Sequence, residues 1–157
     1  MKTLQIDEKQ AKTLYKTAMP ELKQMLEEAF GEDFFNVLAK VKTFADALAI
    51  TGRPEVPPFS DVPEDLREFF KATYKVVVIN EALNDGKRFD LYDSSVFRYY
   101  PWFKTKGSPS GFAFDVSGYV NTYAIAGSGS RLRVLSDEAA THIGKIFLEV
   151  WENVQLK

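Results

Sequence analysis

Cysteine is absent from this sequence, and histidine occurs once, as His142. Without cysteine the chain has no disulfide framework, no thiolate metal site and no thiol nucleophile. Long apolar runs are also missing: no stretch approaches the length of a membrane span, and the first residues lack the apolar core of a secretion signal. These absences favour a cytoplasmic protein that does not bind a membrane.

Patterns that would indicate a catalytic or metal centre are missing too. The sequence contains no G-x-S-x-G elbow, no pair of histidines and no EF-hand spacing of carboxylates. His142 lies on the charged side of a predicted helix, which favours a place on the surface. The acids near the aromatic region, Asp90, Asp93 and Asp115, are typical of solvated loop residues and helix caps rather than of a hydrolytic pair. We therefore expect a non-enzymatic protein with no catalytic residue, metal or cofactor.

A strong charge of either sign is the third absence. The formal net charge is −2 at pH 7. Domains that bind nucleic acid through their whole surface are usually strongly basic, so this composition leaves room only for a local nucleic-acid site. At 157 residues, 45% of them hydrophobic, the chain can form one full core but not two large domains.

Residues 1–31 predict a helical extension. The stretch from Asp7 to Ala18 forms one short helix, and a break falls before Pro20, because a residue that precedes proline is disfavoured in the α region. Pro20 opens a second helix with a single apolar stripe, and Gly31 ends it. Such a stripe needs a second surface, so it fits either packing within the chain or a homo-oligomer formed through residues 1–31.

Residues 34–157 predict one α+β domain. It begins with a helix from Val37 to Leu48 that closes at Gly52. A proline-rich segment, 53–62, then leads to a central helix of about 22 residues that starts at Pro63. The apolar run within that helix would also suit a buried strand, but no turn signal interrupts the stretch, so a helix is favoured.

After Gly86 the pattern changes to aromatic runs and alternation. Segments typical of strands lie within 88–103, 111–116 and 131–136, with glycine-rich turns at 107–111 and 127–129. We expect a small antiparallel sheet of three or four strands. Ser136 caps a terminal helix, which should cover one face of the sheet. Its apolar face comprises Ala140, Ile143, Ile146, Phe147, Val150, Trp151 and Val154.

Aromatic and basic residues gather in one region. Of 22 aromatic residues, 11 lie between residues 89 and 123, and the segment 94–136 carries a net charge of +4. Bases stack on rings, and Arg and Lys bind phosphate, so this combination fits a planar anionic ligand. The predicted ligand-binding residues are Arg98, Tyr100, Trp102, Lys104, Ser128, Ser130, Arg131 and Arg133.

Two alternatives stay open within this region. The turn at 127–130 can direct backbone N–H groups toward an anion, or it can be a plain hairpin turn. About half of the strand rings must belong to the core, because alternate residues of a strand face opposite sides. Which half is buried cannot be fixed across Pro101, where a bulge or a bend would change the parity.

The segments KTFADAL, PEDLREFFKATYKVVVINEALNDG, YYPWF, SGFAF and GSRL, followed by an amphipathic helix, occur in this order between about Val41 and Leu156. This order resembles an uncharacterised family of small proteins encoded by phages and prophages of gut bacteria. The N-terminal LYKTAMPELKQMLEEAFG is similar to an extension in some members. The resemblance implies a phage-encoded protein in a bacterial cytoplasm and implies no activity. Arg133 stands where members often have a cysteine, so no thiol chemistry carries over.

Three functions fit these patterns. The first is a non-enzymatic protein that sequesters a nucleotide-like ligand or blocks a host defence factor through its aromatic and arginine residues. The second is a protein-interaction or virion-associated module that oligomerises through residues 1–31. The third is an accessory protein for single-stranded nucleic acid, which would use the same aromatic and basic strands.

Overall fold

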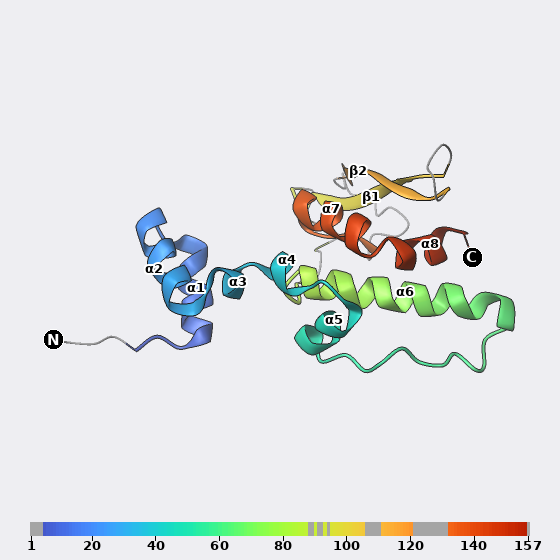
Figure 1. Ribbon diagram of the computed structural model, residues 1–157, viewed down its shortest axis with the longest axis horizontal. Helices are drawn as coiled ribbons and strands as arrows, with labels where there is room; N and C mark the ends of the chain where they lie inside the picture. Colours follow the sequence, from blue (N-terminus) through green and yellow to red (C-terminus); the bar gives the residue numbers. More distant parts are fainter. Residues whose placement is uncertain are drawn as a thin grey trace. The chain divides into compact units, whose positions relative to one another are not determined.

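The computed structural model describes residues 5–87, 90, 93, 95–105, 111–120 and 132–156. Its elements are α1 (Glu8–Thr17), α2 (Pro20–Phe30), α3 (Glu32–Phe35), α4 (Val37–Lys40), α5 (Phe44–Thr51), α6 (Glu64–Leu83), β1 (Arg98–Lys104), β2 (Ala113–Val120), α7 (Asp137–Ile146) and α8 (Leu148–Leu156) (Figure 1). Helices together with an antiparallel pair of strands make this an α+β protein, as predicted. The chain forms two compact units, Met1–Lys40 and Val41–Lys157, whereas the sequence suggested a division near residues 31–34.

The first unit contains the two predicted N-terminal helices. Helix α1 starts with a capping box: the Asp7 carboxylate accepts the N–H of Gln10 at 2.8 Å, and the Gln10 side chain accepts the N–H of Asp7 at 3.0 Å. Helix α2 begins at Pro20 and ends at Gly31, as predicted. Gly31 has a φ of 87°, a conformation that favours glycine.

Aromatic rings join the helices of this unit. Tyr15 of α1 stacks on Phe35 of α3 with ring centroids 4.1 Å apart, and Phe30 of α2 stacks on Phe34 of α3 with centroids 5.1 Å apart. Among the described apolar residues of the unit, only Ala11 and Leu26 are fully buried. The unit therefore has a small core for its 40 residues.

The single helix predicted from Val37 to Leu48 is wrong, because the structure divides it into α4 and α5. Thr43 starts a new helix as an N-cap, with its hydroxyl accepting the N–H of Asp46 at 3.2 Å. The Asp46 carboxylate in turn accepts the N–H of Thr43 at 2.7 Å. The Thr43 hydroxyl also donates to the Asp46 carboxylate at 2.8 Å, and this bond together with the backbone N–H of Thr43 holds the pKa of Asp46 below its ordinary value. A capping box thus overrides the continuous apolar periodicity.

Helix α6 is the centre of the second unit and lies between α5 and α8 (Figure 1). Its 20 residues include the apolar run at 74–79, which is helical as predicted. Val76, Val78 and Ile79 are buried, whereas Val77 is 39% exposed, so the run is not enclosed on every side. Asn84 links the end of the helix to the segment before α7, because its side-chain oxygen accepts the N–H of Leu135 at 2.8 Å.

The sheet has fewer strands than predicted. Among the described residues it consists of β1 and β2, paired antiparallel with Arg98 opposite Val120 and a bulge after Trp102. The predicted third strand is reduced to one bridge, in which Val134 and Tyr99 exchange backbone hydrogen bonds of 2.8 and 2.9 Å. Ser136 caps α7 two residues later, which leaves no length for a strand. The strand pattern near residues 88–93 falls almost wholly outside the described residues.

The C-terminal helix covers one face of the sheet, as predicted, but Phe147 divides it into α7 and α8. Ser136 is the N-cap and accepts the N–H of Ala139 at 3.1 Å. Ile146, predicted to belong to the apolar face, is wrongly placed there, because the break at Phe147 leaves it 51% exposed. Trp151 of α8 packs near Phe103 of β1, with ring centroids 5.7 Å apart.

Gly144 allows α7 to lie directly on the sheet. A Cβ atom at this position would be 2.2 Å from Cδ2 of Phe114 and 3.0 Å from Cβ of Pro101. Replacing glycine by alanine inside a helix usually stabilises it by up to about 1 kcal/mol. Here we expect Gly144→Ala to reduce the free energy of unfolding by about 1–3 kcal/mol, because the core is overpacked. Denaturant unfolding measures the change.

A double-mutant cycle with Phe114→Ala provides the control. Removing the ring should abolish most of the cost of Gly144→Ala. An equal cost in both backgrounds would show that this contact does not explain the glycine.

Candidate functional site

The register of β1 decides which predicted site residues lie together. Pro101 lies within the strand, opposite Ser117, without disturbing the alternation. Pro101 and Phe103 face the C-terminal helices, where Gly144 and Trp151 contact this side of the sheet. The remaining alternate residues, Arg98, Tyr100, Trp102 and Lys104, therefore share the opposite face. We call this the outer face of the sheet.

Two rings form a platform on the outer face. The centroids of Tyr100 and Trp102 are 5.5 Å apart, with an interplanar angle of 58°. Gly118 of β2 pairs with Tyr100 and gives both rings room to lie across the sheet, since a Cβ there would be 2.7 Å from Nε1 of Trp102. Trp102 is 54% exposed. An indole held against a neighbouring ring and open to solvent is suited to stacking on a planar ligand.

Arg133 reaches the same platform from the segment before α7. Its guanidinium carbon lies 5.0 Å from the centroid of Tyr100, a cation–π contact. Burial lowers the pKa of Arg133, Tyr100 opposes this effect, and the Arg98 guanidinium adds to it. The group stays charged at neutral pH, because arginine deprotonates only far above it. A positive charge therefore lies beside the two rings.

The other two described cations of the predicted site differ in exposure. Arg98 is completely buried, so its charge acts from beneath the surface. Lys104 is exposed, but its ammonium lies 2.9 Å from a carboxylate oxygen of Asp115, the residue inserted by the bulge in β2. An exposed ion pair of this kind contributes about 0–1 kcal/mol, so an incoming phosphate can replace the carboxylate at little cost.

The structure brings together five of the eight predicted ligand-binding residues: Arg98, Tyr100, Trp102, Lys104 and Arg133. Ser128, Ser130 and Arg131 lie outside the described residues, together with the rest of the glycine-rich turn. Their part in the site stays a prediction.

A second exposed aromatic cluster escaped the prediction. Tyr119 of β2 is 61% exposed and meets Phe97 edge-on, with centroids 5.2 Å apart. Tyr119 pairs with Tyr99 in the register, so it lies on the face opposite the platform. The alternation of β2 indicates which of its residues share a face. Only their pairing with β1 shows that Tyr119 lies on the face opposite the platform.

His142 has a structural environment that differs from the prediction. It was expected at the surface, yet it is partly buried, and its Nε2 lies 2.5 Å from the carbonyl oxygen of Val41. Because a carbonyl oxygen only accepts hydrogen bonds, Nε2 carries the proton. The bond ties α7 to Val41, two residues before the N-cap of α5, a contact that helical periodicity could not indicate.

Gly118→Ala should displace the platform without unfolding the protein. The new Cβ would meet Nε1 and Cδ1 of the Trp102 indole and Cζ of the Tyr100 ring, and these side chains can move aside on the exposed face. We expect the unfolding free energy to change by less than about 1 kcal/mol. The NMR resonance of the Trp102 indole N–H should shift. Ser117→Ala, a change on the other face of β2, should leave that resonance in place; equal shifts in the two variants would contradict the proposed packing.

Searches for other kinds of site, and for similar proteins, give no further assignment. Within the described part of the chain, no group of three or more His, Asp or Glu residues is arranged to hold a metal ion. In the same residues no helix combines the length and the apolar character needed to cross a membrane. Comparison of the chain with protein-family models, with curated proteins and with solved structures finds no match.

Proposed function

We propose that this protein is a non-enzymatic binding protein whose outer sheet face takes a planar, anionic ligand of the nucleotide type. One observation supports this most: the half-exposed Trp102 lies beside Tyr100, and Arg133 contacts the ring of Tyr100. A stacking surface and a fixed positive charge thus occur side by side. These are the two groups that a base and a phosphate require.

The expected binding mode follows from these contacts. The base stacks on the indole of Trp102, an interaction typically worth about 1–3 kcal/mol. The phosphate binds the guanidinium of Arg133, which lies beside the Tyr100 ring. Lys104 adds a second cation once the phosphate replaces Asp115. The platform consists of one pair of rings, Tyr100 and Trp102, and this size suits a single nucleotide better than a long strand of nucleic acid.

The resemblance to phage-encoded proteins gives this binding a biological setting. In a bacterial cytoplasm, a protein that binds a nucleotide signal without consuming it would lower the concentration of that signal. Blocking a host defence factor through the same surface is the related alternative.

A thermal-shift screen of the full chain against nucleotides, cyclic dinucleotides and short oligonucleotides tests the proposal. A ligand that binds the native state adds about 2.7 kcal/mol of stability at 100 times its Kd, so the midpoint must rise. Trp102→Ala should abolish the shift. Tyr119→Ala removes an equally exposed ring from the opposite face and should retain it.

Three outcomes would count against this assignment. Flat traces for the wild type would exclude the nucleotide class at the concentrations used. Equal loss of the thermal shift in Trp102→Ala and in Tyr119→Ala would show that the platform is not the binding site. Binding of oligonucleotides alone, with strong salt dependence, would favour the accessory role on single-stranded nucleic acid.

For the N-terminal unit we propose homo-oligomerisation, again with a single observation in support. Met19 and Met25 are 72% and 65% exposed, and Leu14 and Leu22 are also exposed. The charged residues of α1 give it a net positive charge and those of α2 a net negative charge, so the two helices of one copy complement those of a second. Burial of these side chains would also enlarge the unit's small core.

Sedimentation of the full chain tests this second proposal. The double variant Met19→Ser/Met25→Ser should shift the protein toward monomer, because it removes the most exposed apolar side chains. Ile50→Ser, which changes an exposed apolar residue of the other unit, should not. A wild type that is monomeric at all concentrations would contradict the proposal.

A further inference from the structure

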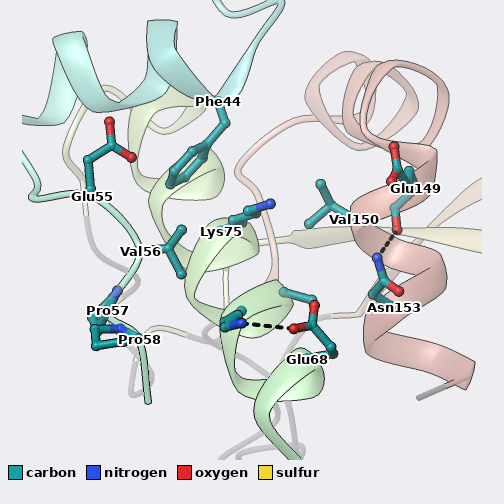
Figure 2. A pocket seen from close by; sticks show the side chains of 12 residues that line it. Phe44, Glu55, Val56, Pro57, Pro58, Glu68, Lys75, Glu149, Val150 and Asn153 are labelled. Atoms are coloured by element: carbon teal, nitrogen blue, oxygen red, sulfur yellow. Dashed lines mark hydrogen bonds and ion pairs between the residues drawn. The ribbon is translucent and has the colours of Figure 1, made fainter. Parts of the chain in front are cut away.

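A groove in the second unit lies apart from the residues of the outer face. It has a volume of about 580 Å³, within the usual range for small-molecule sites. Its walls are the segment 55–58, one face of α6 and the start of α8, with Phe44 of α5 at one end (Figure 2). We call segment 53–62 the strap, because it connects α5 to α6 along this groove.

Both ends of the strap are fixed to α6 by side chains. Near the start, Arg53 donates two hydrogen bonds to the Glu81 carboxylate, at 2.9 and 3.0 Å, and the Tyr74 hydroxyl donates to the Pro54 carbonyl at 2.7 Å. At the far end, Arg67 donates to the carbonyls of Val62 and Ser60 at 2.8 and 3.1 Å.

Between these fixed ends the strap contains Pro57 and Pro58, whose rings restrict the backbone. The wall of the groove is therefore held in place rather than free to collapse onto α6. A preformed wall lowers the ordering cost of binding.

Charges of both signs border an apolar surface in this groove. Lys71 is paired with Glu68 at 2.9 Å. Lys75 lies between Val56 of the strap and Val150 of α8 in Figure 2, with its ammonium 5.9 Å from the Phe44 ring centroid. Among the described residues no carboxylate forms an ion pair with Lys75.

Glu55 and Glu149 border the groove from opposite walls (Figure 2). Within the same described part of the chain, neither carboxylate has an ion-pair partner. The groove thus offers one ammonium to an anion and two carboxylates to a cation, and Phe44, Val56 and Val150 line the same groove.

We infer that this groove binds a small zwitterion with an apolar body, the chemistry of an apolar amino acid or a short peptide. The ligand carboxylate pairs with Lys75, its ammonium pairs with Glu55 or Glu149, and its apolar part packs on Phe44 and Val56. A purely anionic ligand would meet the two carboxylates, and a purely cationic one would meet Lys75. Only a ligand of both signs satisfies the charges on all sides.

NMR titration of the full chain with L-phenylalanine and with the dipeptide Phe-Leu tests this inference. We expect saturable shifts of the backbone resonances of Val56, Ala72 and Lys75. The tighter of the two probes indicates whether a free amino acid or a peptide is the better ligand. N-acetyl-L-phenylalanine lacks the ammonium and L-phenylalaninamide lacks the carboxylate, so each should bind at least about tenfold more weakly.

Lys75→Met removes the ammonium, keeps an apolar stem against Phe44, and should weaken binding by about tenfold or more. Lys71→Met is the matched control one turn away and should stay within about threefold, because Glu68 already holds that ammonium. Circular dichroism checks that both variants are folded. Absence of saturable shifts with both probes, equal binding of the N-acetyl compound, or equal loss in the two variants would overturn the inference. Nucleotide binding at Trp102 should be unchanged in Lys75→Met, which separates the two sites.

Discussion

The second unit depends on the fact that only one face of its small sheet can lie under the C-terminal helices. Gly144 permits α7 to approach within contact distance of Phe114 and Pro101, and this approach fixes which face is covered. Strand alternation then dictates that Tyr100 and Trp102 are on the other side. The exposure of the platform is thus a consequence of how the core packs.

Glycine has two opposite roles in this sheet. Gly144 of α7 brings a helix onto one face, and Gly118 of β2 leaves space for the rings of Tyr100 and Trp102 on the other. Large rings placed over a strand glycine shield backbone that a side chain would otherwise cover. Arg133 then adds its charge to Tyr100 from a segment that Asn84 holds in place through Leu135. Residues far apart in the sequence therefore form one surface.

Local chemistry was predictable from the sequence, and contacts between distant segments were not. Pro20, Gly31 and Ser136 mark helix ends because their effects involve only neighbouring residues. The Thr43 and Asp46 capping box is equally local, and the apolar periodicity around it concealed it. The number of strands, the break at Phe147 and the hydrogen bond of His142 depend on tertiary packing, for which the sequence has no local signal.

The groove beside the strap was equally unpredictable, because its walls come from three separate helices and a connection. Alternation predicted that half of the rings in β1 would be exposed, and only the observed register identified which half.

Trp102 is the exposed ring that we propose as the stacking surface for a planar anionic ligand. The chain has two tryptophans, and Trp151 is buried, so Trp151→Phe leaves Trp102 as the only indole emitter. Fluorescence of this variant during a nucleotide titration measures the claim directly. We expect a red-shifted emission, as for an indole in water, that at least one nucleotide class quenches in a saturable manner. A blue-shifted emission that no nucleotide changes would contradict this proposal.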